Sequence, residues 1–266
     1  MKRYKSRAAF LIITIVFLGL TYLPLLASES TVDAFAREDG IFENLTAIYL
    51  LAASVVFVAV FIRFRKSSWL LKLSYLGLVL LFFVGAGEEI SWGERVFKWN
   101  DHNYIRDMNV QGELTLHNLK YFQGEEAVIP LNTSQLLLAF AFVFTLIIPL
   151  VCRLFPKVER FLAPIFPVMP LDVGVLTVAT YVFQKSMLRI LPLFPGLYQH
   201  PSMPIPQGVH EIREHGFTFA LLVSAIFYFL AKMDAKRAED SNGSLGALTS
   251  TGALMPLSVE GEGEKG

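Results

Sequence analysis

Residues 69–87 read WLLKLSYLGLVLLFFVGAG and continue directly into EEISWGER at residues 88–95. A helix needs about 20 apolar residues to cross the hydrocarbon core of a bilayer. The stretch therefore predicts a transmembrane helix that ends in a dense group of charged and aromatic side chains.

Composition and the rest of the sequence extend this prediction to the whole chain. The 266 residues are 54% hydrophobic and only 17% charged, whereas soluble domains have about 25% charged residues. Further apolar runs occupy residues 8–27, 42–62, 135–154, 171–194 and 216–231. We therefore expect an all-α fold, a polytopic membrane helix bundle with about six transmembrane helices. The short, proline-rich stretch 161–169 is interpreted as interfacial or re-entrant.

Basic residues predict the orientation of the bundle. Fourteen Lys and Arg residues lie near the helix ends on the side of the N-terminus, against six on the other side. Cytoplasmic loops carry such an excess, so both termini are expected in the cytoplasm. The first apolar run has a second interpretation, a cleaved signal peptide. Its apolar stretch is longer than a usual signal core of 7–15 residues, which favours an uncleaved anchor.

The domain organisation follows from the same pattern. Residues 1–237 form the predicted transmembrane bundle, and residues 88–134 form a structured extracytoplasmic loop within it. Residues 238–266 are rich in Ser, Gly and Glu and are expected to be a disordered cytoplasmic tail. The single cysteine, Cys152, excludes an internal disulfide, and the zero net charge gives no indication of nucleic-acid binding.

Candidate catalytic residues stand at the end of the run at residues 69–87. Glu88 and Glu89 are carboxyls at membrane depth, where ionisable groups are costly. If the helix continued, Glu88, Trp92 and Arg95 would share one face. The alternative is a helix end reaching water, with Glu88 and Arg95 partly neutralising each other.

A candidate metal ligand pair lies in the predicted outer loop. Glu113 and His117 are four residues apart, which places a carboxylate and an imidazole on one helical face. This spacing suits two metal ligands, or a carboxylate that orients a histidine base. The spacing is also common by chance.

A second candidate precedes the last apolar run. His210 with Glu214, and Glu211 with His215, form two interlocked pairs at the same spacing. On a helix these side chains share one polar face. The alternative is an amphipathic helix start, where acidic residues favour the positive end of the helix dipole.

Cations in the run 171–194 complete the set of candidate residues. Lys185 and Arg189 lie one helical turn apart in the outer half of the predicted bilayer. Such cations need acidic partners, a lipid phosphate, or a route to the surface. We therefore expect Lys185, Arg189 and Trp92 to bind substrate.

Two segments carry a resemblance. The sequence E-E-I-S-W-G-x-R-x-F at residues 88–97, with N-x-Q-G-E-x-x-L-H-N at residues 109–118, resembles a family of bacterial multi-pass membrane proteins without an assigned activity. This resemblance implies a bacterial inner membrane location. More remotely, the paired glutamates followed by separated histidines look like the CAAX-type intramembrane metalloproteases. That family has Arg four positions after the second glutamate, where this chain has Gly93, and its F-x-x-x-H motif is missing around His117.

These residues predict a metal-dependent hydrolase or transferase that acts on a lipid-linked or membrane-proximal substrate. Glu88 or Glu89 would be the general base toward a water bound to the metal. The ligands of a divalent metal, zinc above others, would come from Glu113, His117, His210, Glu214 and His215.

The alternative is a non-enzymatic carrier or lipid-binding protein. In that case the same acids and cations form a buried ion pair and a proton relay. In both cases the expected partners are membrane lipids.

Overall fold

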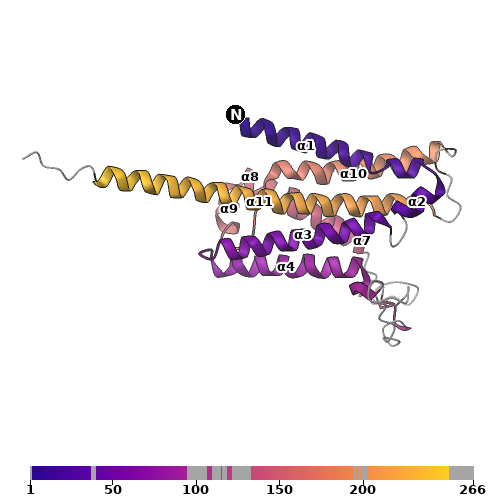
Figure 1. Ribbon diagram of the computed structural model, residues 1–266, viewed down its shortest axis with the longest axis horizontal. Coiled ribbons are helices and arrows are strands. Elements are labelled where there is room, and N and C mark those ends of the chain that lie inside the picture. The colour runs from indigo at the N-terminus through magenta and orange to yellow at the C-terminus, as the bar shows by residue number, and fades with distance from the viewer. Residues whose placement is uncertain are drawn as a thin grey trace, which may run out of the picture. The chain divides into compact units, whose positions relative to one another are not determined.

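The computed structural model describes residues 2–36, 40–94, 107–109, 115, 119–121, 133–194, 196, 198 and 203–251. Within these residues the protein consists of helices and contains no strand, which confirms the all-α prediction. The chain divides into two compact units, residues 1–228 and 229–266. The first unit contains the helix bundle (Figure 1), and the described part of the second is a single stretch of helix.

Helices α3 (Ile41–Arg63) and α4 (Trp69–Glu89) form an antiparallel hairpin (Figure 1). The hydroxyl of Ser68 accepts a hydrogen bond from the backbone N–H three residues later and so begins α4. Between the two helices the Ser54 hydroxyl donates to the carbonyl of Val79 at 2.9 Å. This bond satisfies a polar group that would otherwise be buried among apolar side chains.

The remaining helices are α1 (Lys2–Leu20), α2 (Glu29–Ala36), α7 (Thr133–Phe142), α8 (Ile148–Leu154), α9 (Pro156–Leu162), α10 (Gly174–Ile190) and α11 (Ile205–Thr251). Short 3-10 turns stand at Leu23–Leu26, Ser91–Gly93, Leu171–Val173 and Leu191–Leu193, and a π-helical turn stands at Val143–Ile147.

Helix α11 forms the centre of the first unit. Most of its side chains between residues 208 and 225 are buried. Ala220 and Val223 belong to a cluster with apolar residues of α1 and α10. Phe217 contacts a ring of α7, and the Tyr228 hydroxyl lies 2.7 Å from that of Tyr75 on α4. A helix covered on nearly all sides is a core helix, so α11 positions its neighbours.

Helices α7 and α8 are joined by the π-helical turn, and proline explains its position. Pro149 has no N–H to donate to the carbonyl of Thr145, four residues earlier, and a π-turn accommodates such a missing bond. The Thr145 hydroxyl lies 2.7 Å from that of Thr177 on α10. A Cβ at Gly174 would lie 2.8 Å from the Thr145 carbonyl oxygen, so glycine permits this close approach.

Five helices in the described chain are long and apolar enough to cross a membrane. They are Arg7–Leu26, Trp69–Glu89, Gln135–Leu154, Ile205–Ser241 and a span within Glu29–Arg63 that contains α3. The sixth predicted segment is also helical, but its α-helical part, α10, has only 17 residues. At 1.5 Å per residue these residues span about 25 Å.

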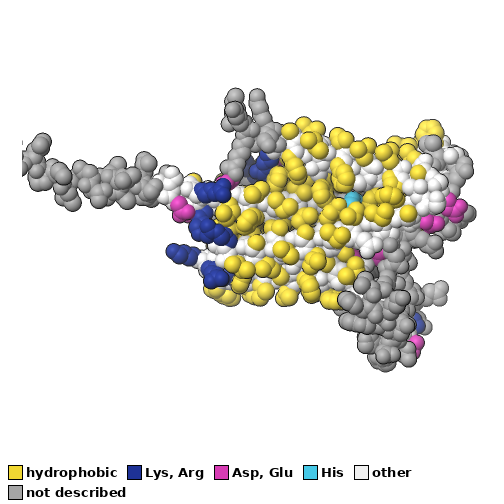
Figure 2. Space-filling view, in the orientation of Figure 1, with side chains coloured by type: hydrophobic (Ala, Val, Ile, Leu, Met, Phe, Trp, Pro, Cys, Tyr) yellow, Lys and Arg dark blue, Asp and Glu magenta, His cyan; other side chains and the backbone are white. Residues whose placement is uncertain are grey.

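The outer surface of the first unit is apolar along the helices (Figure 2). Ile13 on α1, Val55 on α3 and Leu73 on α4 are 68%, 60% and 56% exposed. A soluble protein rarely exposes so large a contiguous apolar surface, whereas a bilayer covers it. Exposed basic residues, among them Arg65 and Lys66, follow at the α3–α4 turn, where Figure 2 shows Lys and Arg side chains gathered.

Two predicted segments differ from, or extend beyond, what the structure describes. Helix α11 continues to Thr251, although residues 238–266 were expected to be disordered. The strong helix formers of residues 232–239 (KMDAKRAE) lead into this extension, whereas nothing in residues 240–251 (DSNGSLGALTST) explains its further course. Residues 252–266 and most of the predicted loop 88–134 lie outside the described residues.

The contact between α10 and α11 yields a prediction. A Cβ on Gly216 would lie 2.6 Å from Cγ2 of Thr180, and β-branched threonine has little freedom to move aside. We expect Gly216→Ala to destabilise the protein by about 1–3 kcal/mol. Thermal unfolding in detergent, followed by circular dichroism, measures this change.

The matched control is Gly77→Ala on α4, where nothing lies within 4 Å of the added Cβ. This substitution is expected to leave the melting temperature unchanged or slightly higher, because alanine favours helix over glycine. Equal melting temperatures for the two variants would contradict the packing of α11 against α10.

Candidate functional site

The chain reverses direction at the end of α4. Helix α4 ends at Glu89, and Ser91, Trp92 and Gly93 have φ angles of 47°, 52° and 77°. A left-handed conformation costs a residue other than glycine roughly 1–2 kcal/mol. The helix therefore does not continue through the EEISWGER motif. Arg95, which would share a face with Glu88 on a continued helix, lies outside the described residues.

The indole of Trp92 folds back on α4 and stabilises this reversal. Its Nε1–H donates to Oε1 of Glu88 at 2.6 Å, and its ring lies edge-on to Phe83 at 6.2 Å. A Cβ on Gly87 would lie 2.9 Å from the indole ring, so glycine makes room for it. The motif thus fixes where the carboxyls of Glu88 and Glu89 stand at the end of the bundle.

Carboxyls from three helices gather around Glu89. The side chains close enough for their charges to act on it belong to α3, α4 and α11, and they are Glu43, Glu88, Glu211 and Glu214. We call these five residues the carboxyl cluster. Glu43 begins α3, Glu88 and Glu89 end α4, and the other two lie in the first turns of α11. Because these helix ends meet, residues far apart in the sequence form one site.

Two cationic residues, Arg213 of α11 and Lys185 of α10, lie next to the carboxyl cluster, and we call them the cations across α11. Arg213, Glu214 and Lys185 lie close enough to His210 for their charges to act on it. The guanidinium of Arg213 forms an ion pair with Glu214, with Nη2 3.2 Å from Oε1. Lys185 also lies over the ring of Tyr181, with Nζ 5.5 Å from its centroid. Lys185 is exposed on α10, and its charge reaches His210, which lies near Glu214.

Arg213 and Tyr22 are buried beside each other. Arg213 is 5% exposed and Tyr22 is 3% exposed. The charge of Arg213 acts on the Tyr22 hydroxyl. Within the part of the chain that the structure describes, neither Nε of Arg213 nor the Tyr22 hydroxyl has a hydrogen-bond partner. Both atoms are buried donors, and leaving such a group unsatisfied costs about 1–3 kcal/mol.

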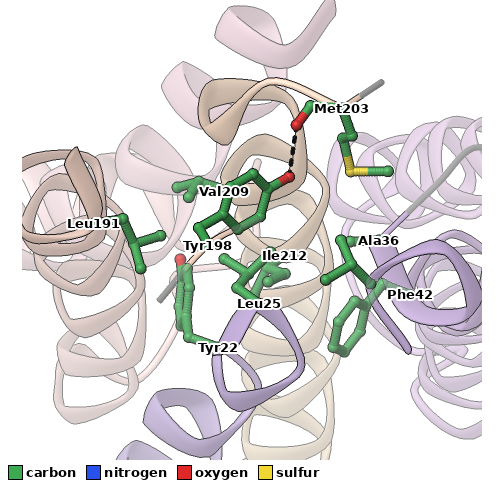
Figure 3. Packing of buried hydrophobic residues seen from close by; sticks show 10 residues of the cluster. Tyr22, Leu25, Ala36, Phe42, Leu191, Tyr198, Met203, Val209 and Ile212 are labelled. Atoms are coloured by element: carbon green, nitrogen blue, oxygen red, sulfur yellow. Dashed lines mark hydrogen bonds between the residues drawn. The ribbon is translucent and has the colours of Figure 1, made fainter. Parts of the chain in front are cut away.

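An apolar cluster closes this end of the bundle (Figure 3). The Tyr22 ring packs there among residues that include Leu191, Val209 and Ile212. Tyr198 is different from Tyr22, because its hydroxyl donates to the Met203 carbonyl at 2.8 Å. Burial raises the pKa of the Tyr198 hydroxyl, and the nearby charge of Asp33 raises it further. This tyrosine therefore remains a neutral donor that holds the segment before α11.

His215 lies apart from the other polar residues of α11. Its side chain is fully buried, and neither ring nitrogen has a hydrogen-bond partner. The ring lies 4.8 Å from Phe42, 5.2 Å from Tyr49 and 6.4 Å from Phe17, measured between centroids. We call these three rings the aromatic enclosure. His215 and His210 point about 140° apart around the helix, so they face different neighbours.

The remaining predicted site residues are placed as follows. Glu113 and His117 lie outside the described residues. Arg189 is exposed at the end of α10. Within the residues that the structure covers, no group of three or more His, Cys, Asp or Glu side chains is arranged to hold a metal ion.

Sequence reasoning missed Tyr22 and did not assign a role to Arg213. Tyr22 follows an apolar run, and its sequence neighbours are Thr21 and Leu23, so no charged pattern marks it. Arg213 was a single basic residue within the segment that carries the histidines.

The chain matches no protein-family model, no curated protein and no solved structure.

The aromatic enclosure yields a prediction for His215. Replacing His215 with Phe removes two unsatisfied nitrogens and keeps a ring among rings. We expect His215→Phe to retain or raise the melting temperature in detergent. His210→Phe is the control in the same helix, and it should lower the melting temperature, because it places an apolar ring beside Glu214 and Lys185. A loss of folded protein in His215→Phe alone would contradict this account.

Proposed function

We propose that this protein is a non-enzymatic carrier or lipid-binding protein of the bacterial inner membrane, with a buried ion-pair and proton relay. The relay consists of the carboxyl cluster and the cations across α11. The relay binds a charged ligand at the outer end of the bundle.

We propose six membrane crossings with both termini in the cytoplasm. The distribution of basic residues supports this orientation. Helix α10 is continuous with 3-10 turns at both ends, from Leu171 to Leu193. A 3-10 turn rises about 2.0 Å per residue, so the whole segment is long enough for a sixth crossing. In this orientation the carboxyl cluster faces outward.

The observation that carries the proposed function is the carboxyl cluster itself. Four carboxyls from three helices stand close enough to Glu89 for their charges to act on it, at the end of an apolar bundle. Like charges this close raise the free energy of the fully ionised state. A shared proton or a bound cation relieves this repulsion. A site of this kind takes up and releases protons as its ligand changes.

The cations across α11 supply the second half of the relay. Arg213 forms an ion pair with Glu214, and Lys185 stands near His210. Intramembrane charges of opposite sign commonly pair and mark ion or proton pathways. Binding of a charged ligand on either side of Arg213 changes the balance of charge at the carboxyl cluster.

The relay is tested by Glu89→Gln in reconstituted protein. Infrared difference spectra between alkaline and acidic buffer show the carbonyl stretch of a carboxyl that gains a proton. We expect this band to grow on acidification in wild type and to weaken in Glu89→Gln, because glutamine has no proton to gain. Glu159→Gln, at an exposed position of α9, is the control and should retain the band of the cluster. Identical difference spectra for wild type and Glu89→Gln would exclude the relay.

A metal-dependent hydrolase or transferase is the second candidate. The proximity of His210 and Glu214 supports it, since imidazole and carboxylate both bind zinc. We propose that purified protein then contains about one zinc per chain. Elemental analysis should show that His210→Ala loses the metal and that His215→Phe retains it, because His215 faces the aromatic enclosure. Protein without metal after purification in zinc-containing buffer would exclude this candidate.

A further inference from the structure

Two buried donors in the site lack an acceptor. They are Nε of Arg213 and the hydroxyl of Tyr22, and each residue is more than nine-tenths buried. Because Arg213 acts on Tyr22 through its charge, the two donors serve one small region between α1 and α11. Buried polar groups are nearly always hydrogen-bonded in native proteins. Within the described residues these two donors have no acceptor, although the carboxylate of Glu214 contacts Nη2 of the same guanidinium.

The chemistry around these donors selects an anionic acceptor. The planar guanidinium of arginine matches the oxygens of phosphate and carboxylate. One of its edges contacts Glu214 through Nη2, and Nε is available to a second oxygen. Lys185 and His210 stand in the same neighbourhood as Arg213. Arg213 and Lys185 supply positive charge, and the imidazole of His210 can supply an N–H donor, so this position favours an anion.

The charge of the side chains changes from positive to negative around α11 within two helical turns. At 100° per residue, Arg213, His210, Glu214 and Glu211 follow one another around the helix in steps of about 40–60°. The first two lie toward Tyr22 and Lys185. The last two lie within the carboxyl cluster around Glu89. A ligand spanning this face meets the guanidinium of Arg213 at one end and carboxyls at the other.

We propose that the site binds a zwitterion. Its phosphate or carboxylate accepts hydrogen bonds from Arg213 and Tyr22, and its ammonium group faces the carboxyl cluster. This inference rests on the proposed function and names the ligand of the same site. The chemistry is shared by the headgroup of an amine-bearing phospholipid and by a free zwitterion such as phosphoethanolamine.

Binding to the full-length protein in detergent tests the proposal. Native mass spectrometry compares retention of phosphatidylethanolamine, which is zwitterionic, with phosphatidylglycerol, which has the phosphate and no amine. A competition with free phosphoethanolamine follows. We expect at least tenfold preference for the zwitterionic lipid. Displacement by free phosphoethanolamine identifies the headgroup chemistry as sufficient, whereas retention of the lipid against it identifies the lipid as the ligand. Equal retention of the two lipids, without binding of phosphoethanolamine, would overturn the proposal.

Tyr22→Phe is the decisive variant, because it removes one hydroxyl and keeps the ring in its apolar cluster. The loss of one hydrogen bond, net about 0.5–1.5 kcal/mol, weakens binding roughly two- to tenfold. Tyr181→Phe, at an exposed position of α10, is the matched control and should bind as wild type does. Arg213→Lys keeps the charge and loses the planar fork, so it should weaken binding of the anionic group more than Tyr22→Phe does. Unchanged binding in both Tyr22→Phe and Arg213→Lys would contradict the assignment of these residues as donors to the anionic group.

Failure of zwitterion binding can be distinguished from failure of the proton relay, because the two experiments measure different groups. The infrared band of Glu89 reports the proton and does not require Tyr22. A Glu89 band without zwitterion binding overturns the ligand and leaves the relay. Zwitterion binding that depends on Tyr22, without a Glu89 band, supports the ligand and excludes the relay.

Discussion

The enclosure of charged side chains within an apolar bundle is the constraint on which this structure depends. Arg213 is almost fully buried on the central helix, and an isolated charge in such surroundings is very costly. Glu214 compensates it directly, with 3.2 Å between Nη2 and Oε1. At the ends of α3, α4 and α11, by contrast, carboxyls face Glu89 without balancing it. Like charges in such a place favour a shared proton or a bound cation.

The turn at the end of α4 directly follows two of the five carboxyls, Glu88 and Glu89. Two consecutive left-handed residues that are not glycine, Ser91 and Trp92, make the turn energetically costly. The indole hydrogen bond to Glu88 and the contact across Gly87 offset this cost. A straight continuation of α4 would have carried Trp92 beyond these contacts. The turn instead holds the carboxyls at the end of the bundle.

Small and hydroxyl-bearing residues allow the helices around this site to approach closely. Gly216 lies against Thr180, and Gly174 lies against the carbonyl of Thr145. In lipid the hydrophobic effect does not draw helices together, so close packing and hydrogen bonds between helices carry more of the stability. The hydroxyl pair of Thr145 and Thr177 is one such bond. Packing of this kind fixes α10, and therefore Lys185, relative to α11.

Some of this organisation could be predicted from the sequence, because it depends on local properties. The length and apolarity of the runs predicted the helices, since a bilayer requires about 20 apolar residues from each. The apolar run at residues 171–194 also predicted a helix, although the α-helical part of α10 has only 17 residues and is shorter than the candidate membrane-spanning helices. The pairs His210–Glu214 and Glu211–His215 were visible as a spacing on one helix.

Only the tertiary structure decided which side chains face each other. His210 and His215 share a short polar stretch, yet one stands near Lys185 and the other among three aromatic rings. Tyr22 carries no local pattern, and its position within reach of the Arg213 charge depends on how the segment after α1 packs against α11. The sequence by itself determined that the helices would form and where ionisable residues stand along them. The neighbours of each polar group were decided by helix packing, because residues that touch across a bundle have no fixed spacing in the chain.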